Sequence, residues 1–143
     1  MKENPNTGVA LRSEGRFVFL QKNYDETLAL LQQCGNYLEY RGKYERIAMD
    51  VEERVLYTIA TSHITVQLTS VLSWLMAWKA VEAGEIKRSD LTLEKYRLQD
   101  IHPLTADQID MFKKLAQPVP SLIEASGMLY MRMRRLEKTM LGK

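Results

Sequence analysis

The sequence contains only two histidines and one cysteine, and their positions favour neither a metal site nor acid–base or redox chemistry. His63 is followed by Gln67 four residues later and has no acidic residue near it, so the paired ligands that hold zinc on a helix are missing. The other histidine, His102, precedes Pro103 and is expected in a turn. The single cysteine, Cys34, falls among apolar residues at helical spacing, which is typical of a buried and unreactive thiol. We therefore expect neither a metal ion nor a cofactor.

Nucleophilic and phosphate chemistry have no better support. Ser73 stands in the apolar run VLSWL rather than in the glycine-flanked turn that exposes a catalytic serine. Asp107 and Asp110 follow Thr105 and Gln108, whose spacing matches a helix capping box, so capping explains the acidic pair. No glycine-rich loop that would cradle a phosphate is present. The sequence predicts that this protein is not an enzyme.

A basic group near the C-terminus could contact nucleic acid. It consists of Arg132, Arg134, Arg135 and Lys138. The whole chain has 20 basic and 18 acidic residues and thus a net charge of +2, too close to neutral to indicate a polyanionic partner. A solvated helix face is the simpler interpretation, and a DNA-binding regulator remains an alternative hypothesis. A further alternative is a purely structural dimerisation module, which would form a stable dimer and bind no other partner.

Contact with other proteins is the class of function that the residues favour. Trp74 and Trp78 are four residues apart, a spacing that suits an aromatic anchor on one helix face, although both could equally fill the core. Met128 and Met131 fall on the mainly polar side of the last predicted helix, and exposed methionines can form adaptable binding surfaces. The candidate interaction residues are Ser73, Trp74, Trp78, Met128, Met131, Arg132 and Arg135.

The element that must position most of these residues is a segment without charge. From Val55 to Trp78 the chain has 24 residues and no charged side chain, in a protein that is 27% charged. Nine serine, threonine, histidine and glutamine residues interrupt this run, which argues against a membrane span. Negative charge near Asp50 and a glycine at Gly84 predict a single helix of roughly 30 to 40 residues between them. Its apolar residues occur on every side, so it is expected to be central or shared with a second copy.

The other elements are arranged around this helix. Residues 1–16 are expected to form a flexible tail, and residues 17–143 one helical domain. A first helix is predicted to begin near Asn23 or Asp25 and to end at Gly42, and a last helix begins at the Pro118/Pro120 pair. The expected fold is all-α, a three-helix up-down-up bundle that forms a homodimer. No secretory signal pattern occurs, so we expect a cytoplasmic protein.

The sequence resembles a known family of helical proteins. The stretch SHITVQLTSVLSWLMAWKAVEAGEI, which contains Ser73, Trp74 and Gly84, is followed by a segment ending EKYRLQ, and together they are similar to the RcdA-like family of regulators of CtrA degradation. The opening FVFL…YDETLALL and the closing PSLIEASGMLYMRMRRLE extend the resemblance to about residues 17–141. Members of the family that are associated with CtrA degradation carry a flexible polar extension after the last helix, whereas this sequence ends at Lys143.

The resemblance implies a fold and a function. The implied fold is a three-helix bundle that forms homodimers and has no catalytic activity. The implied function is that of an accessory adaptor, which helps deliver a cell-cycle transcription regulator such as CtrA to the ClpXP protease. The implied partners are ClpX, a receiver-domain adaptor, a cyclic-di-GMP effector and the cargo itself. Such an adaptor would act by tethering, because two weak contacts raise the effective concentration of cargo at the protease.

Overall fold

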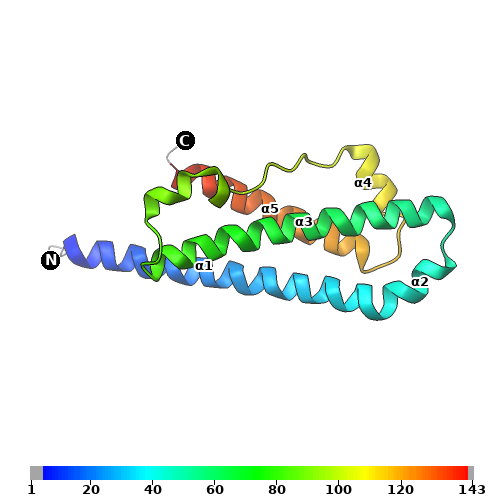
Figure 1. The fold of residues 1–143 in the computed structure, drawn as a ribbon, viewed down its shortest axis with the longest axis horizontal. Helices are drawn as coiled ribbons and strands as arrows, with labels where there is room; N and C mark the ends of the chain where they lie inside the picture. Colours follow the sequence, from blue (N-terminus) through cyan, green and yellow to red (C-terminus); the bar gives the residue numbers. More distant parts are fainter. Residues whose placement is uncertain (1–4, 142–143) are drawn as a thin grey trace.

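The structure is a computed structural model that describes residues 5–141, with side chains described from residue 15 onward. Within these residues the chain is all-α and contains no strand, as the sequence predicts. Three long helices run along the molecule, and shorter helical segments join them (Figure 1). In chain order the elements are α1 (Pro5–Asn36), the π-helical turn η1 (Tyr37–Arg41), α2 (Gly42–Ala48), α3 (Val51–Glu82), the 3-10 turns η2 (Arg88–Thr92) and η3 (Glu94–Tyr96), α4 (Ala106–Phe112) and α5 (Val119–Met140).

The central helix α3 begins and ends where the sequence predicts. Asp50 is its N-cap residue, and the Asp50 carboxylate accepts a hydrogen bond from the backbone N–H of Glu53 at 2.8 Å. This bond satisfies a donor that has no partner within the first helical turn. At the other end Gly84 has a φ of 77°, a left-handed conformation that glycine adopts without a steric cost. The helix between these two residues has 32 residues.

The two later helices also begin at their predicted caps. Thr105 and Gln108 form a capping box, in which each side chain accepts a hydrogen bond from the backbone N–H of the other residue. The last helix, α5, follows Pro118 directly and has Pro120 in its first turn, where a missing N–H costs no helical hydrogen bond.

The first helix begins earlier than the sequence predicts. It begins at Pro5, not near Asn23 or Asp25, so residues 5–16 of the expected tail belong to α1. Pro5 suits a first helical turn, and no further proline interrupts the chain before Pro103. The flexibility of residues 5–16 remains a prediction, and residues 1–4 lie outside the described part of the chain.

The predicted end of the first helix at Gly42 is also wrong, because the chain stays helical through this residue. The residue has helical backbone angles, φ −60° and ψ −34°, and the chain continues through it from η1 into α2. A side chain at this position would collide with the Tyr57 hydroxyl of α3 and lie 3.1 Å from the carbonyl oxygen of Tyr37. Glycine is therefore needed here for the close approach of α3, not for a helix stop.

The direction of α5 differs from the expected up-down-up order. The first two long helices are antiparallel, because Arg16 bonds to Glu82 at 3.3 Å near one end of α3 and the Tyr37 ring lies 6.2 Å from the Tyr57 ring near the other. α5, however, runs parallel to α3 (Figure 1): Ser126 donates a hydrogen bond to Gln67 at 3.0 Å, and further along both helices Trp78 and Met140 line one cavity. The order is therefore up-down-down.

The long connection between α3 and α5 explains why these two helices are parallel. Between the end of α3 and the start of α5, residues 83–118 form the η2 and η3 turns, an extended stretch and α4 (Figure 1). This connection runs back along the length of α3, so α5 starts beside the same end of the molecule at which α3 starts. Helical bundles with one long crossover connection contain such parallel neighbours.

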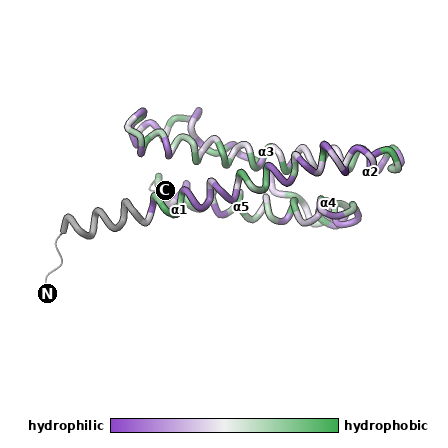
Figure 2. The backbone as a smooth tube through the Cα atoms, turned by 90° about the horizontal axis from the view of Figure 1, so that it is seen from below, coloured by the Kyte–Doolittle hydropathy of each residue, from purple (hydrophilic) through white to green (hydrophobic). Residues whose placement is uncertain are grey.

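The core is centred on α3. Ile64, Leu68, Val71 and Leu75 are completely buried between α1 and α5, and burial of each such side chain stabilises the fold by about 1.5–3 kcal/mol. Figure 2 shows hydrophobic and hydrophilic residues alternating along the long helices, as expected of helices that bury one face. Although α3 is long and apolar enough to cross a membrane, it packs against other helices along its buried side, as the core helix of a bundle does.

Candidate interaction surfaces

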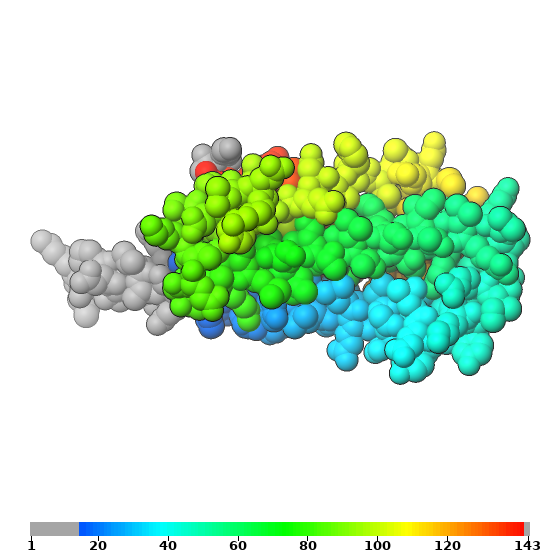
Figure 3. Space-filling view, in the orientation of Figure 1, coloured from blue at the N-terminus to red at the C-terminus, as the bar shows by residue number. Residues whose placement is uncertain are grey.

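The outward face of α3 carries a stripe of uncharged, exposed residues. The α3 stripe consists of Val55, Ile59, Ser62, Val66, Thr69, Ser73 and Met76, which are alternately four and three residues apart and all exposed. Val55 and Met76 are 53% and 54% exposed, values that are high for apolar side chains in a long helix. In Figure 3, α3 crosses the middle of the visible face between α1 and the segment that follows α3. A spacing that averages 3.5 residues is the spacing of a helix–helix seam.

The two tryptophans do not belong to this surface. Trp74 and Trp78 are each 2% exposed and pack edge to face, with ring centroids 6.1 Å apart. The guanidinium groups of Arg16 and Arg88 each lie 5.6 Å from the centre of the Trp78 ring. Of the two interpretations open from the sequence, the structure therefore supports the core, and both residues leave the set of candidate interaction residues.

Met128 and Met131 lie at the surface, 62% and 47% exposed. Together with Gly127 they form one wall of a groove of ≈ 650 Å³ between α5 and the segment that contains α4. Phe112 and Ile109 of α4 contribute to the opposite wall. We call this feature the α4–α5 groove; it joins residues that the sequence alone does not bring together.

The basic residues of α5 are not one free cationic face. Arg132 bonds to Asn23 at 2.8 Å and to Glu26 at 3.0 Å, which ties α5 to α1. Arg134 forms an ion pair with Asp100 at 3.0 Å. Arg135 is exposed. The candidate Arg132 therefore has a structural role, whereas Arg135 stays available at the surface.

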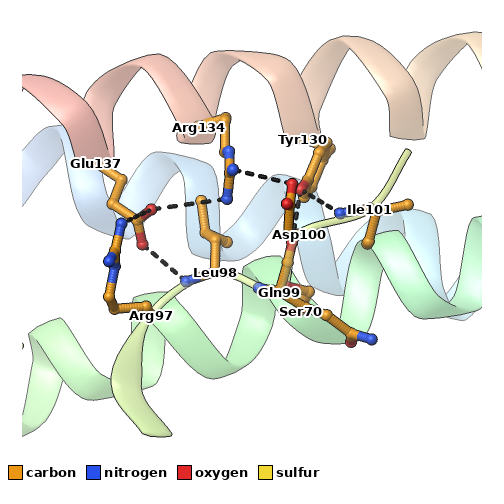
Figure 4. A network of polar contacts seen from close by, with 9 residues as sticks. All are labelled: Ser70, Arg97, Leu98, Gln99, Asp100, Ile101, Tyr130, Arg134 and Glu137. Atoms are coloured by element: carbon orange, nitrogen blue, oxygen red, sulfur yellow. Dashed lines mark hydrogen bonds and ion pairs between the residues drawn. The ribbon is translucent and has the colours of Figure 1, made fainter. Parts of the chain in front are cut away.

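A polar network that sequence analysis missed holds the extended segment 97–104, which we call the connector (Figure 4). Its backbone N–H groups bond to side chains of the long helices: Leu98 to Glu137 at 2.7 Å, Gln99 to Ser70 at 2.9 Å and Ile101 to Tyr130 at 3.1 Å. The Tyr130 hydroxyl also donates to the carbonyl oxygen of Gln99 at 2.6 Å. Side chains from α3 and α5 thus satisfy backbone groups that would otherwise need strand partners.

Glu137 is the centre of this network. Its side chain is 2% exposed and lies 3.9 Å from both Arg97 and Arg134. Glutamate is rarely buried unless it is paired. A charged residue near the inner stripe of α5, one position after Leu136, was the signal in the sequence that could have revealed the network.

Burial shifts the pKa values of four ionisable groups. Burial raises the pKa of the Cys34 thiol, so the thiol stays protonated, as expected of an interior cysteine. Burial also raises the pKa values of Tyr37 and Tyr57, and it lowers the pKa of His63, which faces the groove. In the described part of the chain, no three histidine, cysteine or acidic residues are placed to hold a metal ion.

Comparisons with known proteins agree with this picture of the fold. A crystal structure of RcdA from Caulobacter crescentus is similar with a TM-score of 0.68 and 22% sequence identity, covering 85% of this chain and 89% of that one. At this identity the similarity establishes the fold, and it confirms the resemblance predicted from the sequence. A search of curated proteins finds no match. The family model described as a protein of unknown function, DUF1465, matches residues 15–143. The chain therefore belongs to the DUF1465 family and has an RcdA-like fold.

Proposed function

We propose that this protein is a non-enzymatic, cytoplasmic adaptor in regulated proteolysis, which forms homodimers and helps present a CtrA-like transcription regulator to the ClpXP protease. The observation that carries the proposal is the similarity to RcdA over 85% of the chain.

In this proposal the long helices α1, α3 and α5 form a three-helix bundle that serves as a rigid platform. The α3 stripe is the surface on which a second copy packs. Isologous two-fold pairing places the same surface of both subunits in contact, so an uncharged stripe meets its own copy without charge repulsion. Ser62, Thr69 and Ser73 lie among the larger apolar residues of the stripe, and their small side chains let two helices approach closely.

The test is recovery of the protease from the native cell. The full chain, carrying an affinity tag, is expected to co-purify ClpX or a receiver-domain adaptor, together with a cell-cycle transcription regulator that accumulates when the protein is deleted. A matched control is the same chain with Gln33 changed to Lys, an exposed change on α1 that should leave recovery intact. Recovery of neither partner by a chain that is folded and dimeric would contradict the proposal.

The DNA-binding alternative receives no support from the geometry. Arg132 and Arg134, two of its four basic residues, are engaged in ion pairs with acidic side chains of this chain. The same tagged preparation tests it, because binding to DNA through basic residues weakens steeply as salt is raised.

A further inference from the structure

Helix α3 contributes two polar side chains to the α4–α5 groove, and part of their hydrogen-bonding capacity is unused. His63 and Gln67 are four residues apart, so they lie on the same face of the helix, and both line the groove. Gln67 is 5% exposed, and its amide oxygen accepts a hydrogen bond from the Ser126 hydroxyl at 3.0 Å. Among the described residues, no group bonds to the Gln67 amide nitrogen or to the His63 ring.

The unused Gln67 nitrogen faces the groove. In the described part of the chain, the fully enclosed side-chain nitrogen and oxygen atoms without a hydrogen-bond partner belong to Arg16 and Trp78, not to Gln67. The Gln67 nitrogen therefore keeps some open surface, and the groove is the cavity that Gln67 lines. Buried polar side chains normally have a hydrogen-bond partner. A ligand atom that accepts a hydrogen bond from this nitrogen would supply it.

The walls of the groove are mainly apolar. Phe112 of α4 is buried in one wall, and the exposed side chains of Met128 and Met131 belong to the wall formed by α5. Lys113 and Glu124 are the charged residues among the described ones that line the groove, and both are exposed. Because their charges cancel, the lining favours neither a cation nor an anion.

The polar groups of α3 and the size of the groove suit a small, neutral ligand. Burial lowers the pKa of His63, so its ring is neutral near neutral pH and offers one N–H donor and one acceptor nitrogen. The groove has a volume of ≈ 650 Å³, within the range of about 300–1,000 Å³ that is typical of small-molecule sites. Such sites are mainly apolar and contain a few polar groups that orient the ligand. A protein surface would cover the rim, whereas the free Gln67 nitrogen is reached from inside the groove.

We propose that the α4–α5 groove binds a small, uncharged and mainly apolar molecule that carries a carbonyl oxygen. The carbonyl oxygen accepts a hydrogen bond from the Gln67 amide nitrogen, and the apolar part packs between Phe112 and the methionines of α5. The His63 ring supplies a second hydrogen-bonding group beside the first. A ligand bound in this way contacts α3, α4 and α5 at once and stabilises the folded chain by mass action. The inference goes beyond the adaptor role and does not depend on it.

The probe is prodan, an uncharged naphthalene dye with a ketone at one end, whose emission shifts to shorter wavelengths in apolar surroundings. We expect the full chain to bind prodan saturably and with this shift. In NMR spectra, the side-chain amide signal of Gln67 should move as prodan is added. The anionic dye anilinonaphthalenesulfonate should bind at least about tenfold more weakly, because its charge would lose water without gaining an unopposed cation.

A pair of dyes tests the hydrogen bond to Gln67. A prodan analogue in which a methylene group replaces the ketone should bind the wild type about threefold to tenfold more weakly, measured by displacement of prodan. Gln67→Leu removes the amide and keeps a side chain of similar size, so this variant should bind the two dyes equally. The Ser126 hydroxyl also bonds to the carbonyl oxygen of Ile123 at 3.2 Å, so Gln67→Leu leaves it with a partner. A merely structural effect would weaken both dyes by the same factor.

Gly127 tests whether prodan binds in the groove. It lies inside α5 with no positive φ, lines the groove, and a Cβ atom placed there meets no atom within 4 Å. Gly127→Trp should fill the groove and weaken prodan binding at least about tenfold, whereas the matched control Gly127→Ala should bind within about twofold of wild type. Both variants should keep the helical circular dichroism of the wild type, since glycine is the less favourable helix residue.

Four results would overturn the proposal. They are no saturable binding of prodan, equal binding by Gly127→Trp and wild type, equal binding of the anionic dye and prodan, and a wild type that does not prefer the ketone to the methylene analogue. If Gly127→Trp does not fold, the comparison of the two dyes on wild type and Gln67→Leu decides alone. None of these measurements involves ClpX, so failure here and failure of the adaptor role are distinguished by separate experiments.

Discussion

At the scale of single residues, Glu137 carries the largest predicted energetic effect. Glu137→Ala removes the acceptor for the Leu98 N–H and leaves Arg97 and Arg134 without their buried partner. We expect the free energy of unfolding to fall by about 2–4 kcal/mol, measured by urea denaturation. Asp100→Asn is the control: the Asp100 side chain is 82% exposed, so loss of its ion pair should cost less than about 1 kcal/mol. An equal loss of unfolding free energy in the two variants would show that the burial of Glu137 is not the reason for its contribution to stability.

His63 gives stability a defined pH dependence. Burial lowers its pKa below the reference value of 6.5, so the unfolded chain takes up the proton at a higher pH than the folded chain does. Stability is therefore fully present above pH 6.5 and decreases as pH falls toward the lowered pKa of the folded state. Urea denaturation between about pH 7.5 and pH 5.5 should show this loss, and it should be smaller in His63→Gln. An NMR titration in which the His63 ring protonates above pH 6.5 would contradict the assignment.

At the scale of the elements, two glycines in the same helical region should respond in opposite ways to alanine. At Gly42 a methyl group would collide with the Tyr57 hydroxyl, so Gly42→Ala should destabilise the fold by about 1–3 kcal/mol. At Gly35, which is exposed, a methyl group meets nothing within 4 Å. Gly35→Ala should therefore stabilise the protein by about 0.5–1 kcal/mol through helix propensity. Thermal unfolding of both variants measures the difference, and a shift of the same sign in both would be inconsistent with close packing at Gly42.

Gly42 also shows which helix ends can be predicted from a sequence and which cannot. Helix ends that depend on local hydrogen bonds, at Asp50 and in the Thr105/Gln108 capping box, were predicted, because the residues that form them are neighbours in the chain. The continuation through Gly42 was not. The sequence alone does not distinguish a glycine that ends a helix from a glycine that leaves room for a side chain of another helix. At Gly42 the second role applies, because the Tyr57 hydroxyl of α3 packs against it.

At the scale of the whole molecule, two outcomes depended on how the elements pack against one another. The all-α class follows from periodicity, but the direction of α5 depends on where residues 83–118 run, and this path is set by side-chain bonds such as that between Glu137 and the connector. Similarly, Ser73 was predicted as an interaction residue, and Trp74 as a residue of either the core or the interface. They are adjacent, and a rotation of 100° per residue places Ser73 on the outward face and Trp74 in the core. Within the uncharged run, the residues of the α3 stripe are alternately four and three positions apart, and this spacing could have predicted which residues face outward.

That outward face leads to the prediction about assembly. The α3 stripe from Val55 to Met76 is about 32 Å long at 1.5 Å per residue, and it contains no charge. If a second copy packs on it, Val66→Lys places a lysine from each subunit into the interface, where two unpaired charges oppose association. We expect light scattering to give twice the chain mass of 16.6 kDa for wild type and the single mass for Val66→Lys.

The control for this prediction separates loss of the dimer from loss of the fold. Val66 is 38% exposed and lies outside the core, so Val66→Lys should retain the helical circular dichroism of the wild type. Gln33→Lys adds the same charge to the exposed face of α1 and should remain dimeric, which excludes an effect of net charge. A dimer that persists in Val66→Lys would place the contact on another face. A wild type that is monomeric at high concentration would leave the stripe free for a different protein, because an uncharged face of this length on a central helix still needs an explanation.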